Sequence, residues 1–120
     1  MRDEKDGAAP APDPPARDAR IDAFRAALGA DPDDIVVRFG LAQALLAAGR
    51  FAESAAEFGE LTRRAPRYTA AYRGLGRALE GDGRPDEAAR AYEAGVAMAC
   101  ETGDLQTGQE MEVFLKRLRG

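Results

Sequence analysis

Apolar residues recur every three to four positions along most of the chain, which is the spacing of one face of an α-helix. The segment from residue 51 to residue 64 is a clear case. Phe51, Ala55, Phe58 and Leu61 would lie on one side of a helix there. The next stripe consists of Tyr72, Leu75, Ala78 and Leu79.

Glycine, proline and a capping aspartate divide this pattern into separate helices. Asp34 precedes an apolar segment and can accept a hydrogen bond from the free amides of the first helical turn. Gly49 ends that helix, and Pro66 ends the next one. Pro85 suits a first helical position, because its missing N–H donor would be unpaired there in any case. The sequence predicts helices over 34–48, 51–64, 68–81 and 85–101, between an earlier helix near 18–31 and a closing helix near 103–119.

The predicted helices repeat with a period of 34 residues. Phe24, Phe58 and Tyr92 follow one another at that interval. The interval also relates Leu41 to Leu75, Leu45 to Leu79, Gly49 to Gly83, and Pro32 to Pro66. Several independent positions therefore agree on one repeated unit of two helices.

One repeated domain with a short leader accounts for the chain. Residues 1–17 are rich in Pro, Ala and charge, so we expect a disordered leader there. A half repeat at 18–33 has Phe24 in phase with the second helix of the repeat. Full repeats follow at 34–67 and 68–102, and the segment 103–119 keeps helical spacing but loses the repeat's residues. The predicted fold class is all-α.

The repeat resembles the tetratricopeptide repeat (TPR), a helix–turn–helix unit of this length, and the chain resembles a small bacterial TPR protein. The matching residues are Leu41, Ala42, Leu45, Gly49, Ser54, Phe58, Leu61 and Pro66 in the first unit, and Tyr72, Leu75, Gly76, Leu79, Gly83, Ala88, Tyr92 and Gly95 in the second. Four positions depart from the family's usual residues: Arg38 replaces an aromatic, Leu61 and Gly95 replace alanine, and Cys100 replaces the closing proline. The resemblance implies a right-handed α-solenoid of antiparallel helix pairs, with about two full units between the half repeat and the closing helix.

The resemblance also implies a binding site. In similar proteins the first helices of successive repeats line a concave groove that holds an extended peptide or a helix of a partner. The groove-facing positions here would be Val36, Phe39, Gln43, Leu46, Ala70, Arg73, Arg77 and Glu80. This groove would be apolar on one side and charged on the other.

For two pairs of these residues the sequence allows two interpretations each. Phe39 and Leu46 are either covered by neighbouring helices or left partly exposed for a partner, since exposed apolar patches usually mark binding sites. Arg73 and Arg77 lie four residues apart on one helical face, where like charges repel by about 0.2–0.5 kcal/mol. They form either a solvated face with an internal Arg77–Glu80 pair or a site for a carboxylate, which the planar guanidinium suits.

The amino-acid composition limits the reactions and ligands that this chain can support. The 120 residues include no His, so the commonest general base and metal ligand is missing. The single cysteine, Cys100, cannot form an internal disulfide, and we expect it to pack in the core of a protein from a reducing compartment. No glycine-rich phosphate loop is present. We therefore expect no enzyme activity, no catalytic residue, no metal site and no cofactor.

The net charge and the hydropathy of the chain limit the kinds of partner that we expect. The formal net charge of -4 argues against nucleic-acid binding, because that mode relies on a surplus of Lys and Arg. No apolar stretch approaches the ~20 residues that span a bilayer. We therefore expect a cytoplasmic protein without membrane insertion.

These observations favour a protein-binding module or adaptor that holds a short peptide or helix of a partner in the concave groove. An acidic segment of that partner is one candidate ligand. The alternative is a self-assembling scaffold that stacks through the end faces of its solenoid. We expect a monomer or a weak homo-oligomer.

Overall fold

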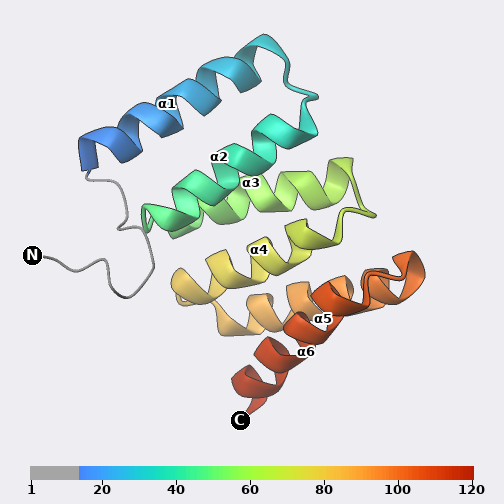
Figure 1. Cartoon of the computed structure of the whole chain (residues 1–120). Coiled ribbons are helices and arrows are strands. Elements are labelled where there is room, and N and C mark those ends of the chain that lie inside the picture. The colour runs from blue at the N-terminus through green and yellow to red at the C-terminus, as the bar shows by residue number, and fades with distance from the viewer. Residues whose placement is uncertain (1–13) are drawn as a thin grey trace, which may run out of the picture.

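The computed structural model describes residues 14–120, which form six helices joined by short turns (Figure 1). These helices are α1 (Pro14–Ala30), α2 (Ile35–Ala47), α3 (Phe51–Arg64), α4 (Thr69–Gly81), α5 (Pro85–Thr102) and α6 (Leu105–Arg119). Figure 1 shows them stacked in chain order, from α1 at the top to α6 at the bottom. The prediction of an all-α solenoid of helix pairs is confirmed.

The first helix begins earlier than the sequence indicated. α1 starts at Pro14, so residues 14–17, which were expected in the leader, are helical. The first amides of a helix have no partner within the helix, so a proline in the first turn costs no hydrogen bond. Pro14 and Pro15 therefore belong to a helix start. Residues 1–13, the rest of the expected leader, lie outside the described residues.

Local chemistry sets the other helix ends. Asp34 caps α2, because its Oδ1 accepts a hydrogen bond of 3.0 Å from the amide of Val37. Gly49 and Gly83 follow α2 and α4 with φ angles of 76° and 73°, in the left-handed region that glycine enters without a steric penalty. These signals act within one turn, which explains why the predicted boundaries of these helices were close.

Large aromatic rings fill the core where the neighbouring helix carries glycine. The side chains of Phe58 and Tyr92 are completely buried. A Cβ atom at Gly74 would overlap the Phe58 ring, and a Cβ atom at Gly76 would overlap the Tyr92 ring. α4 can therefore approach both α3 and α5 closely, because it has no side chain at either contact.

The helices form two layers that curve together. α2, α4 and α6 form one layer, in which α2 and α6 both come within 8 Å of α4 between Cα atoms. α1, α3 and α5 form the other layer, where no Cα of α3 lies within 8 Å of a Cα of α1 or α5. The closely packed layer is therefore the inner side of the curve, and the splayed layer is the outer side.

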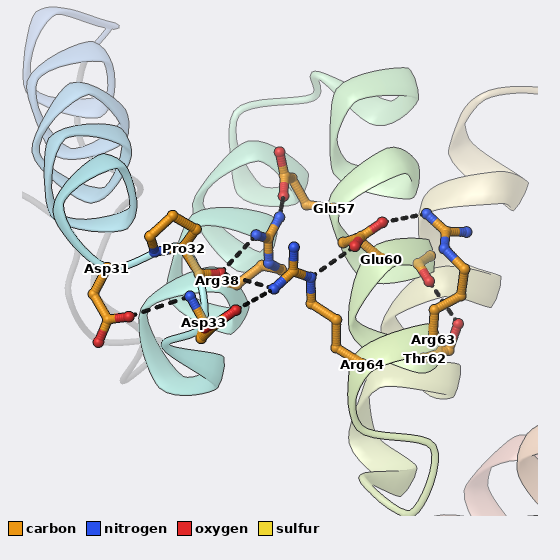
Figure 2. Close-up of polar contacts among 10 residues, drawn as sticks. Asp31, Pro32, Asp33, Arg38, Glu57, Glu60, Thr62, Arg63 and Arg64 are labelled. Atoms are coloured by element: carbon orange, nitrogen blue, oxygen red, sulfur yellow. Dashed lines mark hydrogen bonds and ion pairs between the residues drawn. The ribbon is translucent and has the colours of Figure 1, made fainter.

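Ion pairs on the surface of α3 make the fold sensitive to acid. Glu60 accepts a hydrogen bond of 2.7 Å from Arg64 and another from Arg63, and these hold its pKa at about 2, below the usual 4.5 (Figure 2). A carboxyl whose pKa is lowered by folding stabilises the fold above its unfolded pKa, and this contribution is lost as the pH falls through the folded pKa. We therefore expect the melting temperature to fall between pH 4.5 and about 2. Thermal unfolding at constant ionic strength should show a smaller fall for Glu60→Gln; an equal fall would contradict this role of Glu60.

Candidate functional site

A groove lies on the inner layer, between α2, α4 and α6. It consists of two adjoining hollows of about 280 and 370 Å³, which share Gln43, Leu46 and Arg77. The other lining residues are Ala70, Arg73, Gly74, Glu110 and Phe114 in the first hollow, and Ala47 and Phe51 in the second. We call these ten residues the inner groove.

The structure brings together five of the eight residues predicted for the groove. They are Gln43, Leu46, Ala70, Arg73 and Arg77. The other three lie outside its lining. Val36 is 78% exposed on the first turn of α2. The Phe39 ring packs against the rings of Phe58 and Tyr68, with centroids 5.8 and 5.2 Å away, and Glu80 contacts α5 and α6.

Glu80 holds three helices together. The Tyr92 hydroxyl of α5 donates a hydrogen bond of 2.5 Å to its Oε2, and Arg117 of α6 donates one of 3.2 Å to its Oε1. Burial and the bond to Glu80 raise the pKa of Tyr92. Arg117 also lies over the Phe114 ring, 5.2 Å from its centroid, which places a cation on the ring face. The internal Arg77–Glu80 pair, one of the two alternatives, does not form, and the Glu80 carboxylate accepts from Tyr92 and Arg117 instead.

The two arginines of the inner groove differ in their partners. Arg73 forms an ion pair with Glu110 of α6. Arg77 is exposed, and no hydrogen bond or ion pair joins its guanidinium to another group in residues 14–120. Among the charged residues of the inner groove, Arg77 alone has no ion-pair partner within residues 14–120.

Sequence reasoning assigned no groove residue to the last helix. Glu110 and Phe114 line the inner groove, yet no repeat position could be assigned to them. α6 begins 36 residues after the start of α4, whereas α4 begins 34 residues after the start of α2. This shift moves α6 out of phase with the repeat. The only available signal was its helical spacing, which indicates an inward face but not which residues meet α4.

Cys100 corrects another expectation. The thiol is exposed, so the prediction that it packs in the core is wrong. Ala99 faces the core instead, with 2% of its surface exposed, and it lies against Gly108 of α6. The helical phase at the end of α5 therefore places the small Ala99 inward and the neighbouring Cys100 outward.

Arg38 is a buried residue in the first turn of α2, beside the α1–α2 turn (Figure 2). Its Nη1 donates to Glu57 at 2.7 Å, and its Nη2 donates to the carbonyl of Pro32 at 3.0 Å. Arg64 donates to the same carbonyl at 3.2 Å and pairs with Asp33 at 2.8 Å. These contacts tie the α1–α2 turn to α3, so Arg38 stabilises the fold and is not free to bind a ligand.

The inner groove has the groups for non-covalent binding: a free guanidinium, the amide of Gln43 and the apolar side chains of Leu46 and Phe114. Within residues 14–120, no group of three or more His, Cys, Asp or Glu side chains is placed to hold a metal ion. No helix in the same stretch is long and apolar enough to cross a membrane.

Known proteins share this architecture. The family model for the tetratricopeptide repeat matches residues 39–99. TPR repeat-containing protein PA0015 of Pseudomonas aeruginosa is 34% identical over 98 residues, which are 82% of this chain and 93% of that protein. The solution structure of protein BPP2914 from Bordetella parapertussis is similar with a TM-score of 0.73 and 30% identity, over 82% of this chain and 86% of that one. A tetratricopeptide repeat domain protein from Salinibacter ruber gives a TM-score of 0.67 and 31% identity, over 73% and 89% of the two chains.

The match to the family model covers more than half of the chain. The period of 34 residues and the antiparallel helix pairs agree with it. The relative from Pseudomonas aeruginosa extends the similarity over most of both chains. The chain belongs to the tetratricopeptide repeat family.

Proposed function

We propose that this chain is an adaptor that binds a short peptide of a partner protein in its inner groove. Tetratricopeptide repeats generally mediate protein–protein interactions, and the family is typically non-catalytic. The observation that carries the proposal is the free guanidinium of Arg77 in a groove with apolar sides. The small volume of the two hollows suits a few residues of a ligand and not a folded domain.

The chemistry of Arg77 points to a carboxylate in that peptide. A guanidinium can donate two parallel hydrogen bonds to one carboxylate, which gives both strength and orientation. Gln43 lines both hollows beside Arg77 and adds an amide donor. Leu46 and Phe114 offer apolar contacts next to these donors. We infer that the preferred ligand is an acidic segment with an apolar side chain beside the acid.

Arg73, the arginine of the inner groove that has an ion-pair partner, has a different role. Because Glu110 already neutralises Arg73, a ligand carboxylate at that end would have to displace an anion. Binding would therefore begin at Arg77, with Arg73 and Glu110 forming the far wall of the first hollow.

Reversal of one charge tests the proposal. An array of short acetylated peptides should first show that the wild-type protein prefers acidic sequences. We expect Arg77→Glu to weaken binding of the best acidic peptide by about tenfold to a hundredfold, because a charged hydrogen bond of about 1.5–3 kcal/mol is replaced by repulsion. Fluorescence anisotropy at constant ionic strength measures this change.

Arg20→Glu is the matched control for this experiment. Arg20 is an exposed arginine on α1, outside the inner groove, so its reversal makes the same change in net charge. Equal losses for the two variants would mean that only the overall charge matters and would contradict a site at Arg77. The absence of any preference for acidic peptides would contradict the ligand class.

The surface of the last helix favours the adaptor over the alternative of a self-assembling scaffold. The large apolar residues exposed on α6 are Leu105 and Val113, at 67% and 63%. The exposed residues between them are polar, namely Gln106, Gln109 and Glu112. A polar outer face is what a terminal capping element of a solenoid presents to water.

A further inference from the structure

The outer layer has a groove of its own between α3 and α5. Its volume of about 480 Å³ exceeds that of either hollow of the inner groove. It is lined by Ala52, Ala55, Ala56, Leu75, Leu79, Arg84, Glu87, Arg90 and Ala91, and we call these nine residues the outer groove. No Cα of α3 lies within 8 Å of a Cα of α5, so only side chains could close the gap between the two helices.

The repeat provides an internal comparison, because α1 and α3 flank the equivalent place one repeat earlier. There, Ile21 of α1 is completely buried against Leu41 and Leu45, which are 1% and 0% exposed. The residue 34 positions after Ile21 is Ala55. Leu75, the equivalent of Leu41, is only half-buried beside it. The outer groove is therefore the place where the second repeat lacks the aliphatic side chain that fills the first.

The ion pairs that connect α1 to the start of α3 have no counterpart between α3 and α5. Asp18 of α1 lies 4.0 Å from Arg50, and Arg25 of α1 donates to Glu53 at 2.8 Å. The α3 residues at the positions of Asp18 and Arg25 are Ala52 and Gly59. α3 therefore offers α5 neither an acid nor a base across the outer groove.

One arginine of the outer groove has no ion pair. Arg84 pairs with Glu87 at 2.7 Å and with Asp82 at 3.3 Å. Arg90 is exposed, and in the described part of the chain no hydrogen bond or ion pair joins it to another group. One guanidinium without a direct partner thus lies beside a floor of alanine and leucine. The complementary ligand has a carboxylate next to an aliphatic side chain.

We propose that the outer groove is a second docking site, which binds a short acidic segment of a partner protein. One aliphatic side chain of that segment takes the place over Ala55 and Leu75 that Ile21 takes in the preceding repeat. A carboxylate of the segment pairs with Arg90. The site lies on the opposite layer from the inner groove and shares no residue with it, so the adaptor can hold two partners at once.

Alanine methyl groups make this site directly observable. NMR spectra of the full chain, with ¹³C in its alanine methyl groups, can be recorded during titration with an acetylated peptide in which leucine is flanked by glutamates. We expect shifts at the methyl groups of Ala52, Ala55, Ala56 and Ala91. A matched peptide with alanine for leucine should bind about tenfold more weakly, since it lacks the buried side chain. A peptide with lysine for glutamate should also bind more weakly.

The same spectra distinguish the two grooves. Ala47 and Ala70 line the inner groove and report on that site alone. Shifts confined to these two residues would support the inner site and overturn the outer one. Shifts confined to the outer methyl groups would do the reverse. No shift at the outer methyl groups at millimolar peptide would also overturn the second site.

Two variants complete the test. Ala55→Ile installs the residue that fills the preceding repeat, and we expect it to abolish the outer shifts while the melting temperature is retained. Arg90→Glu removes the free cation without touching the core, and should weaken binding about two- to fivefold relative to Arg20→Glu. Unchanged affinity in a folded Ala55→Ile protein would overturn the site. If that variant does not fold, Arg90→Glu decides: an affinity equal to that of Arg20→Glu would overturn it.

Discussion

Replacement of Phe58 by alanine is expected to destabilise the fold by about 3–5 kcal/mol, which is a large share of the 5–15 kcal/mol that holds a domain together. The side chain is completely buried, its ring lies where Gly74 leaves room, and the Phe39 ring meets it edge-on at 5.8 Å. α2, α3 and α4 meet at this ring. Truncation would leave a cavity that rigid helices cannot close.

Urea denaturation followed by circular dichroism measures this effect as a lower midpoint at an unchanged slope. Val36→Ala is the control, because 78% of the Val36 side chain is exposed. We expect that change to stay within about 0.5 kcal/mol. A loss below about 1 kcal/mol for Phe58→Ala would show that the helices collapse around the missing ring, contrary to the expected rigidity.

Most helices could be predicted because their signals act locally. Asp34, Gly49 and Pro85 each set the backbone or its hydrogen bonds within one turn, so the sequence around them is sufficient. The start of α1 could not be predicted in this way. Prolines suit both an extended leader and the first turn of a helix, and packing of Ile21 on α2 decides between them over a longer distance.

The inner groove could be predicted only where the helices obey the repeat. Gln43, Arg73 and Arg77 have a defined phase on α2 and α4, and they line the groove. The partner of Arg73 could not be found, because Glu110 lies 37 residues away on a helix that is out of phase with the repeat. The charge of a groove depends on such pairings, which only the packed structure fixes.

The outer groove could not be predicted from the repeat alone. Once the structure is known, comparison of one repeat with the next explains why the groove is there. The sequence contains the substitution of Ile21 by Ala55 at the repeat interval, but the apolar stripe of α3 is not interrupted by it. Only the packing shows that Ile21 fills a gap between helices and that Ala55 leaves the next gap open. A small residue on the apolar face of a helix can therefore indicate a surface groove, provided that the equivalent position of another repeat has a larger residue for comparison.

Removal of the buried charge of Arg38 gives the second large effect, and its size depends on whether the charge of Glu57 is also removed. Removal of the guanidinium alone, as in Arg38→Met, leaves the carboxylate of Glu57 without its cation in a half-buried place (Figure 2). We expect a loss of about 2–3 kcal/mol, because a charged hydrogen bond disappears and its partner stays desolvated.

Removal of both charges should recover most of that loss. The Nε of Arg38 is already buried without an acceptor in the described residues, so the native arginine has an unpaired donor. The family usually has an aromatic residue at this position, which indicates that the space accepts an apolar side chain. We therefore expect Arg38→Met with Glu57→Leu to unfold within about 1 kcal/mol of the wild type, since replacement of an ion pair by apolar residues is often neutral. A double-mutant cycle in urea measures the coupling; additive losses would show that the two side chains stabilise the fold independently.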